Sequence, residues 1–306
     1  MSREPKPCRR NIDINSARPS YLHRDWRRKG ALQSGRMKPS IDVAARKAAR
    51  LFKIVEDLGL ACGYERSFKM LERTLLANRF LLGINTADLK PERLLDICRQ
   101  LDMPTRYVDS FQAQLADANA VFLGFEDNQV DCLYKIYLEF WDKVTSDIRR
   151  KSNKQEPALL HLGFKWNTDD NTQGAISRYV CYPMLSVEDI LKRLLDVYQG
   201  DQDQASLRIA GDVMKFAATR SVGNSLVYVE VHEDNSPRQS FDINLYKAQL
   251  RLRDIAPFLS RMREHYSIPA EQFGRLCHLV GNKLFGHLAG GLNREGKDFL
   301  TIYYEA

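Results

Sequence analysis

The chain has 306 residues, of which 44% are hydrophobic and 10% aromatic, enough apolar surface to bury a sizeable core in one large domain or two smaller ones. Lysine and arginine number 46 against 39 acidic residues, and the resulting charge of +7 favours anionic partners such as nucleic acids, phospholipids or phosphorylated small molecules. This composition excludes collagens, coiled coils and wholly disordered chains.

Apolar runs are short throughout the chain. Even the longest, such as 121–125, fall far below the roughly 20 residues that a membrane-spanning helix needs, and no apolar signal segment follows the charged N-terminus. We therefore expect a cytoplasmic protein that does not enter a membrane. The six cysteines are scattered without a Cys-x-x-Cys pair, which predicts buried thiols rather than a zinc or redox site.

Residues 1–39 carry much of the positive excess, interleaved with proline, serine and asparagine. This pattern predicts a mostly disordered basic arm, which is either a solvated tail or a segment that contacts nucleic acid or a substrate. Ser40 is the predicted N-cap of a helix over 41–58, whose apolar residues recur at helical spacing and which stops at Gly59. Residues 40–306 are expected to form a single domain.

Beyond Gly59 one unit repeats, in which two extended segments joined by a polar turn are followed by an amphipathic helix. The five predicted hairpins pair 62–69 with 74–84, 120–126 with 131–141, 158–166 with 175–182, 206–218 with 225–232, and 284–289 with 298–304. Helices are predicted over about 91–116, 142–152, 186–199 and 245–280. Ten antiparallel strands in an open sheet would leave two exposed edges, so the favoured α+β fold is a closed barrel with the helices outside.

Successive side chains of a strand point to opposite faces, so the sequence predicts which residues share the inner or the outer face of the barrel wall. The valines at 227, 229 and 231 share one face of their strand, and Tyr228 and Glu230 share the other. We expect the helices to cover the valine side, which places Tyr228 and Glu230 inside. By the same rule Lys135, Tyr137 and Glu139 line a polar, tyrosine-rich interior suited to a charged ligand. A half-buried sheet whose polar face meets solvent would alternate identically and stays the alternative.

The first hairpin carries a recognisable signature, with an early glutamate, a serine and a lysine soon after it, and a Leu-x-Ala-x-Arg-Phe element. Here these residues are Glu65, Ser67, Lys69, Leu75, Ala77, Arg79 and Phe80. Later hairpins add Gly-Phe-Glu at 124–126 with Lys135, Leu-Gly-Phe at 162–164 with Tyr179, Asn-Ser-Leu-Val-Tyr at 224–228, and the closing Tyr303 and Tyr304. In this order, across residues 40–304, the motifs resemble the cyanobactin-type peptide prenyltransferases, an ABBA-fold family.

The resemblance implies a ten-stranded antiparallel barrel ringed by helices and built from repeated α-β-β-α units. It also implies an activity, the transfer of an isoprenyl group, usually dimethylallyl, from its diphosphate to a side chain of a ribosomal, often cyclic, peptide. Members of the family differ in the acceptor that they modify, which includes Tyr, Ser, Thr, Trp, His and Arg side chains. The donor diphosphate and a peptide are thus the expected partners.

Breaking the allylic C–O bond leaves a diphosphate anion, which the site must hold with fixed positive charge. Arg79 and Lys135 match family positions and are expected to face the lumen for this purpose. The strand pattern does not fix the orientation of four further candidates, and each of them taken alone is better explained as a surface cation. They are Arg178, Lys215, Arg220 and Lys297. Mg²⁺ is expected as a cofactor held mostly by the diphosphate itself, and because no Asp-Asp-x-x-Asp motif is present we expect no metal site in the protein.

The allyl cation must be sheltered from water by aromatic faces, which attract it without trapping it covalently. Candidates for this shield, each of which taken singly is also explained as a packing residue, are Tyr137, Tyr179, Tyr228 and Tyr303.

The acceptor must lose a proton as it attacks, and Glu65 is the candidate base, the alternative being a surface carboxylate paired with Arg66 or Lys69. Glu139, where the family commonly has a basic residue, and Glu230 are candidate acceptor-binding residues. Two inward carboxylates would favour a cationic acceptor such as an arginine guanidinium.

Two other functions stay open. The basic arm and the pI near 9.0 suit a nucleic-acid-binding protein, although we do not favour nucleic acid as the partner, and the same barrel could prenylate a small aromatic metabolite. Phosphate-loop, dinucleotide-binding, zinc-protease and serine-hydrolase motifs are absent from the sequence. His278 and His287 are isolated and are expected to be structural.

Overall fold

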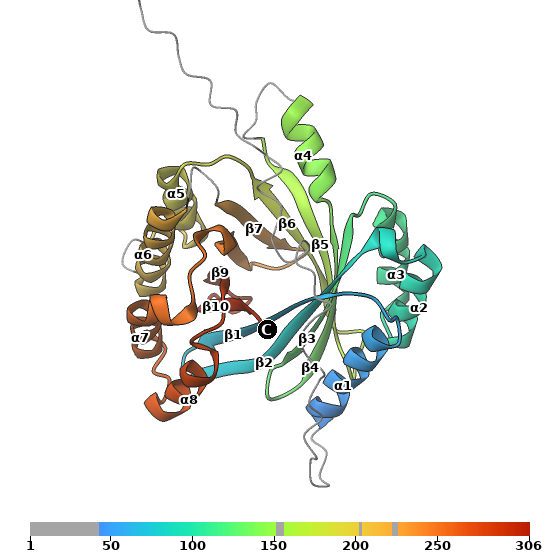
Figure 1. Ribbon diagram of the computed structural model, residues 1–306, viewed down its shortest axis with the longest axis horizontal. Helices are drawn as coiled ribbons and strands as arrows, with labels where there is room; N and C mark the ends of the chain where they lie inside the picture. The colour runs from blue at the N-terminus through green and yellow to red at the C-terminus, as the bar shows by residue number, and fades with distance from the viewer. Residues whose placement is uncertain (1–42, 151–155, 202–203, 222–225) are drawn as a thin grey trace, which may run out of the picture.

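The computed structural model describes residues 43–150, 156–201, 204–221 and 226–306 (Figure 1). Within these ranges ten strands close into an antiparallel barrel in the order β1-β10-β9-β8-β7-β6-β5-β4-β3-β2, and the helices lie outside it. The predicted ten-stranded barrel ringed by helices is therefore confirmed. The predicted basic arm at 1–39 and the Ser40 cap lie outside the described residues.

The elements follow the predicted hairpin repeat closely. The strands are β1 Gly63–Leu71, β2 Thr74–Asn85, β3 Ala120–Asp127, β4 Cys132–Glu139, β5 Ala158–Asn167, β6 Gly174–Tyr182, β7 Val227–Glu233, β8 Gln239–Asn244, β9 Phe285–Leu292 and β10 Asp298–Glu305. The α-helices are α1 Val43–Glu56, α2 Pro91–Gln100, α3 Thr105–Leu115, α4 Trp141–Arg150, α5 Val187–Val197, α6 Ala205–Arg220, α7 Ala256–His265 and α8 Ala270–Val280. Short 3-10 turns are η4 Thr86–Asp88, η5 Tyr246–Ala248 and η6 Leu252–Ile255.

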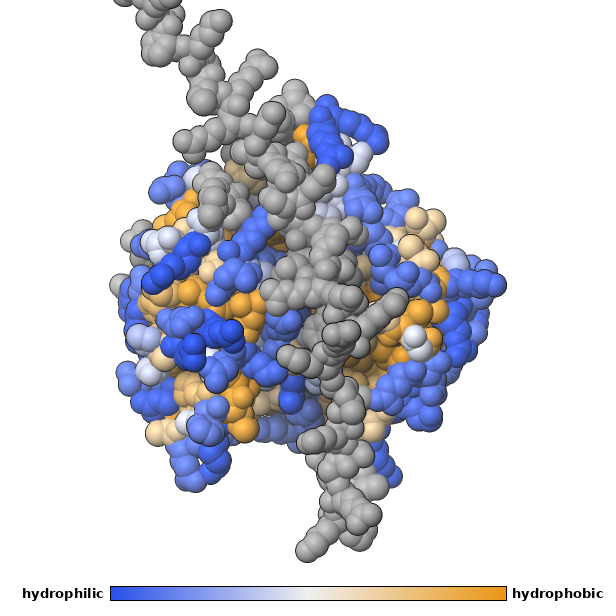
Figure 2. Space-filling model, in the orientation of Figure 1, coloured by the Kyte–Doolittle hydropathy of each residue, from blue (hydrophilic) through white to orange (hydrophobic). Residues whose placement is uncertain are grey.

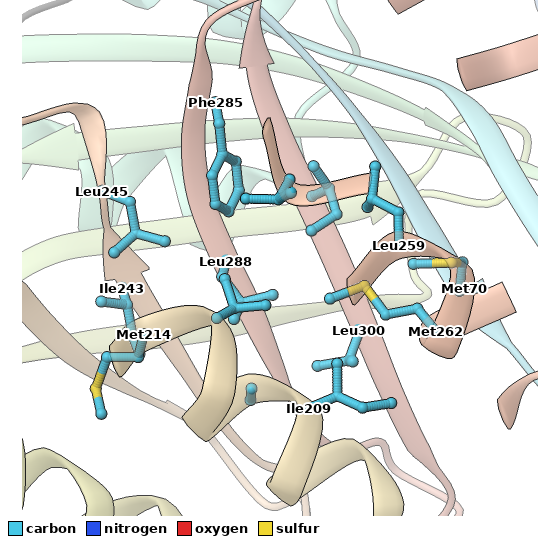
Figure 3. Close-up of a cluster of buried hydrophobic side chains, with 14 of the residues drawn as sticks. Met70, Ile209, Met214, Ile243, Leu245, Leu259, Met262, Phe285, Leu288 and Leu300 are labelled. Atoms are coloured by element: carbon cyan, nitrogen blue, oxygen red, sulfur yellow. The ribbon is translucent and has the colours of Figure 1, made fainter. Parts of the chain in front are cut away.

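The core lies between the barrel and two groups of helices. Helices α1 to α3 pack on the outward residues of β2 to β5, and α5 to α8 pack on those of β7 to β10 and β1. Figure 3 shows the second group, where Ile209 and Met214 of α6 lie against Leu288 of β9 and Leu300 of β10. On the face drawn in Figure 2 hydrophilic side chains cover most of the helices, with apolar residues in scattered patches. Nowhere in the described ranges is a helix long and apolar enough to span a membrane.

One predicted strand is wrong. Residues 206–218 lie within helix α6, whose buried residues Ile209, Ala210, Val213, Met214 and Ala217 recur at helical rather than alternating spacing. The true partner of β7 is β8, a short strand that the sequence pattern missed because its lumen-facing Ser240 and Asp242 interrupt the apolar run. The predicted number of ten strands is right nevertheless, because one strand was predicted where a helix lies and one true strand was missed.

The orientation of β7 is the reverse of the prediction. Val227, Val229 and Val231 face the lumen, and Tyr228 and Glu230 face outward beneath α5. Arg193 of α5 pairs with Glu230 at 3.0 Å, and the Tyr228 hydroxyl donates to the same carboxylate at 3.2 Å. Alternation separates two faces of a strand but does not say which face is inside.

The two ends of the barrel differ. The turns within the five hairpins lie at one end, which we call the hairpin end. At the opposite end, the helix end, the strands connect to the helices. Trp141, Val144 and Ile148 of α4 pack at the helix end on Leu160 of β5 and Val229 of β7. The lumen is therefore partly covered at the helix end.

Candidate active site

Two cavities occupy the lumen. The cationic chamber, about 360 Å³, lies at the hairpin end and is lined by, among others, Lys69, Arg79, Glu126, Lys135, Lys165, Glu233 and Arg238. The acidic chamber, about 90 Å³, lies toward the helix end and is lined by, among others, Glu65, Phe122, Leu160, His161, Val227, Val229, Asp242 and His287. Tyr137, Tyr179 and Tyr303 line both cavities, so the chambers meet at a layer of tyrosines.

Three neighbouring strands build one wall of the cationic chamber. Arg79 of β2 lies opposite Glu126 of β3 in the strand register, and its Nη2 is 3.2 Å from Glu126 Oε2. Lys135 of β4 donates to the same carboxylate oxygen. Burial alone would raise the pKa of Glu126, but the charges of Arg79, Lys135 and Lys69 outweigh it and hold that pKa well below its usual value.

Basic side chains outnumber acidic ones by six to five in the lining of this chamber. The basic ones are Lys69, Arg79, Lys135, Lys165, Arg238 and Arg294, and the acidic ones are the buried Glu126 and Glu233 with Asp131, Asp242 and Glu295. Glu233 is already paired, at 3.7 Å from Arg238 Nη1 and with Arg294. The Nε and Nη1 atoms of Arg79 are buried and have no hydrogen-bond partner among the described residues. The chamber therefore has cationic donors that an anion could satisfy.

The surroundings of the lysines in the cationic chamber disfavour their charged form. Burial lowers the pKa of Lys69 to about 7 and that of Lys135 to about 8, and it lowers the pKa of Lys165 well below its usual value. The neighbouring cations act in the same direction as burial. An anionic ligand would relieve both effects, and this combination is typical of a binding site rather than of a packing core.

The tyrosine layer comes from three strands on different walls. Tyr137 of β4 and Tyr179 of β6 meet edge to face with ring centroids 5.6 Å apart. Gly163 of β5 makes room for Tyr137, because a Cβ atom at this glycine would lie 2.7 Å from the tyrosine ring. Burial raises the pKa of Tyr137, Tyr179 and Tyr303, so their rings stay neutral. Neutral phenols present π faces and hydroxyls without a competing negative charge.

Glu65 of β1 lies in the acidic chamber and is 8% exposed. The Tyr246 hydroxyl donates to its Oε1 atom, and His287 Nε2 lies 3.8 Å from the same atom. On the other side of the imidazole, Nδ1 is 2.7 Å from Asp242 Oδ1. Burial raises the pKa of Glu65, which suits a carboxylate that must accept a proton.

Two further groups lie toward the helix end of the lumen, where Glu139 of β4 is the register partner of His161 of β5. Glu139 of β4 is fully buried at the helix end and accepts a hydrogen bond from Asn119 Nδ2 at 2.7 Å. His161 of β5 lies edge on to Tyr179, and burial lowers its pKa to about 4, so its imidazole is neutral. The lining of the acidic chamber therefore joins two carboxylates, Glu65 and Asp242, to the imidazoles of His161 and His287.

The structure brings together seven of the residues singled out from the sequence. Those in the lumen are Glu65, Arg79, Lys135, Tyr137, Glu139, Tyr179 and Tyr303. For Lys135, Tyr137 and Glu139 the strand alternation had been assigned to the correct side.

Several predicted positions do not reach either chamber. Tyr228 and Glu230 point outward, so the expectation that they line the interior is wrong. Arg178 lies on the outer face of β6, where it pairs with Asp234. Lys215 and Arg220 are exposed on α6, because this segment is a helix and not a strand. Lys297 is exposed in the β9–β10 turn, 3.0 Å from Glu295.

Sequence reasoning missed other lumen residues. Arg238 and Asp242 lie in or beside the overlooked strand β8, and Lys165 directly faces Lys135 across the β4–β5 register. Lys165 was detectable, because it shares its parity with Gly163 inside the Leu-Gly-Phe segment. His287 was expected to be structural, yet it lies between Glu65 and Asp242.

Neither protein-family models nor curated sequences match this chain. Solved structures do resemble it. 5-Dimethylallyltryptophan synthase from Streptomyces coelicolor is 12% identical, with a TM-score of 0.54 over 85% of this chain and 91% of that one. The prenyltransferase PriB, solved with product diphosphate, is 12% identical, with a TM-score of 0.55 over 85% and 90%. The chain has the ABBA prenyltransferase fold.

A third ABBA structure extends the comparison. 6-Dimethylallyltryptophan synthase from Micromonospora olivasterospora, solved in complex with DMASPP and Trp, is 14% identical, with a TM-score of 0.52 over 79% of this chain and 81% of that one. At this identity the likeness establishes the barrel architecture. Any activity of this ABBA barrel has to be argued from its own chambers.

The described lumen residues offer Mg²⁺ little to bind. In the described ranges no three His, Cys, Asp or Glu side chains gather as a metal-binding cluster. The two buried carboxylates of the cationic chamber, Glu126 and Glu233, are paired with arginine or lysine, and the surrounding basic side chains repel a free cation. These residues do not fit a magnesium ion held by the protein.

Proposed function

We propose that this protein transfers an isoprenyl group, with dimethylallyl as the expected donor chain, from its diphosphate to a side chain of a ribosomal, cyclic peptide. One observation carries the proposal, namely that a cationic and an acidic chamber meet at a layer of neutral tyrosines inside one barrel. The bound DMASPP and diphosphate in structures of the same fold support the class of donor.

The cationic chamber supplies what a diphosphate needs. Arg79, Lys135 and Lys165 would face the phosphate oxygens, and the free Nε and Nη1 of Arg79 would donate to them. Mg²⁺ stays a proposed companion that would arrive as a complex with the diphosphate, since the described residues offer it no ligand cluster of their own.

The tyrosine layer lies where the allylic carbon would be. When the C–O bond breaks, its electron pair leaves with the diphosphate oxygen, and the remaining allyl cation faces the rings of Tyr137, Tyr179 and Tyr303. The positive chamber stabilises the leaving anion, and the acidic chamber on the other side stabilises positive charge. The electric field along the lumen therefore favours separation of the two ions.

Glu65 is the proposed base. As the acceptor atom forms its bond to the allyl carbon, its proton passes to the Glu65 carboxylate, and the electrons of the broken bond to hydrogen stay on the acceptor. The carboxylates of Glu65, Asp242 and Glu139 support the hypothesis of a cationic acceptor such as an arginine side chain. Glu230 no longer supports it, because it points outward.

The test is incubation with dimethylallyl diphosphate, Mg²⁺ and a panel of cyclic peptides that contain Arg, Tyr or Trp, read by mass spectrometry. We expect an Arg-containing peptide to gain one C5H8 unit. Glu65→Gln should slow transfer by about 100-fold or more, because base catalysis contributes about 10²–10⁴, while donor affinity stays unchanged. Glu230→Gln, the matched outward carboxylate, should keep the wild-type rate. Full turnover in the Glu65 variant would refute its role.

A free aromatic acceptor is the second candidate. The apolar side chains of Phe122, Leu160, Val227 and Val229 and the small volume of about 90 Å³ favour it. Free tryptophan in the same assay decides between the two, because a peptide enzyme should leave it unmodified. A nucleic-acid-binding role gains no support from the cations of the chamber, which face the lumen.

A further inference from the structure

We propose that His287, held by Asp242, is a positioning residue that keeps Glu65 ionised inside the barrel, an inference that rests on the proposed role of Glu65 as base. Nothing in the sequence pattern indicated this role. It arises from three lumen-facing side chains on β1, β8 and β9, which together form a carboxylate–imidazole–carboxylate row.

The geometry of the row is asymmetric. His287 Nδ1 lies 2.7 Å from Asp242 Oδ1, which is a hydrogen bond, whereas Nε2 lies 3.8 Å from Glu65 Oε1, which is an ion-pair distance without a hydrogen bond. Asp242 therefore fixes the orientation of the charged ring, while Glu65 keeps an oxygen available for the acceptor proton. The Tyr246 hydroxyl holds the Glu65 carboxylate from another side.

Glu65 is surrounded by groups that act on its charge in opposite directions. These groups are Asp242 on β8, Tyr246 on η5, His287 on β9, Tyr303 and Glu305 on β10, Glu139 on β4 and His161 on β5. Burial and the charges of Asp242 and Glu305 raise the pKa of Glu65, whereas His287 and the Tyr246 hydroxyl lower it. The imidazolium supplies the positive charge on the lowering side, so its loss would leave a neutral acid that cannot accept a proton.

Asp242 is what keeps the imidazole charged. Burial alone would lower the pKa of His287, but Asp242, with help from Glu65 and Glu139, raises it to about 9. His161, which lacks such a contact in the same chamber, has its pKa lowered to about 4. The two histidines therefore carry different charges, and the difference follows from the Asp242 contact.

The first test reads the charge of Glu65 without any need for activity. Glutamate carboxyls are labelled with ¹³C, and Glu65 is assigned by the resonance that disappears in Glu65→Gln. In His287→Gln the titration midpoint of Glu65 should rise by at least about one pH unit, because an opposite charge within about 4–6 Å shifts a carboxylate by 1–3 units. Asp242→Asn is read at His287 instead, because Asp242 acts on Glu65 both directly and through the imidazole, in opposite directions. Its His287 midpoint should fall clearly below the wild-type value of about 9, which covers the case in which the histidine variant fails to fold.

His265→Gln is the matched control. His265 forms the same 2.7 Å contact with Asp298, but this pair lies outside the lumen and should leave the Glu65 midpoint unchanged. An unchanged Glu65 midpoint in His287→Gln, or an unchanged His287 midpoint in Asp242→Asn, would overturn the proposal.

The second test reads the pH profile of prenyl transfer at saturating donor. In His287→Gln the acid limb of kcat should move to higher pH, so that kcat on that limb falls about tenfold for each pH unit by which the limb moves and raising the pH restores activity. A merely structural defect would not be repaired by pH, and Glu65→Gln should stay slow at every pH. If the wild type transfers no prenyl group while the Glu65 midpoint still moves, the electrostatic inference holds and the proposed function fails.

Discussion

Arg79 carries buried hydrogen-bond donors in the cationic chamber that have no acceptor among the described residues. Its Nη2 atom pairs with Glu126, but Nε and Nη1 are buried and lack partners among the described residues. Buried donors without partners are costly, typically about 1–3 kcal/mol each, so an anion that accepts from them gains in affinity.

Arg79→Gln should therefore weaken binding of dimethylallyl S-thiolodiphosphate, a donor analogue that does not react. A hydrogen bond to a charged group contributes about 1.5–3 kcal/mol, which corresponds to a loss of about 10- to 150-fold in affinity measured by titration calorimetry. Lys215→Gln removes an equal charge from the outer face of α6 and should bind as the wild type does. Equal weakening in both variants would indicate a general charge effect instead of a lumen site.

The lysines of the cationic chamber predict that donor binding takes up protons. With the pKa of Lys69 lowered to about 7 and that of Lys135 to about 8, both lysines are partly neutral at pH 8. A bound anion raises both values, so protons enter with the ligand and affinity falls as the pH rises from 7 to 9. Calorimetry at pH 8 in two buffers of different ionisation enthalpy should give different heats. Lys69→Met should reduce the difference, and identical heats in both buffers would refute the uptake.

Single lumen residues were predicted from the sequence mainly through the family motifs. Lys135 was placed by motif order and by strand parity together, and Glu65 and Arg79 were placed by motif order alone. Tyr228 and Glu230 rested on parity and on the assumption that valines seek the helices. The alternation of side chains along a strand does not say whether an apolar face packs against helices or lines the lumen. The valines of β7 line an apolar part of the lumen wall in the acidic chamber.

At the scale of elements, the hairpins were predictable and their exceptions have physical causes. Nine of the ten strands coincide with predicted segments, because paired strands with a polar turn leave a local signal. Helix α6 was mistaken because its small and branched residues suit either structure, and β8 was missed because a short strand with a polar lumen face has only Phe241 and Ile243 to mark it. Its register with β7 and β9 is set by long-range pairing that a local pattern does not contain.

Close approach of β8 and β9 depends on one glycine. Gly291 has φ of +127°, and a Cβ atom there would lie 2.7 Å from Ser240 Cα. Gly291→Ala should lower the free energy of unfolding by about 2 kcal/mol or more, because the backbone must shift to relieve both strain and overlap.

Gly274→Ala is the opposite control. A Cβ atom added at this position in α8 would have no neighbouring atom within 4 Å, so the substitution should raise stability by about 0.5–1 kcal/mol through helix propensity alone. Urea unfolding of the two variants measures both effects. A stability loss of equal size in each would contradict the close approach assigned to Gly291.

For the whole molecule, closure of the barrel explains the arrangement of charge. A closed sheet has no edge to protect, so its inner face is free to carry side chains that an open sheet would expose to solvent. Basic side chains gather at the hairpin end, where Arg238 in the β7–β8 turn adds to the strands, and no lysine or arginine of the described ranges lines the chamber toward the helix end, which holds Glu65 and Asp242. The resulting field runs along the lumen and crosses the tyrosine layer.

A crystal structure of the protein with dimethylallyl S-thiolodiphosphate would test most directly whether the donor binds across the cationic chamber and the tyrosine layer. We expect the diphosphate to contact Arg79, Lys135 and Lys165, with the C5 chain against Tyr137, Tyr179 and Tyr303 and its first carbon turned toward the Glu65 chamber. A diphosphate bound on the outer surface, or a prenyl chain that points back to the hairpin end away from the tyrosines, would contradict the account.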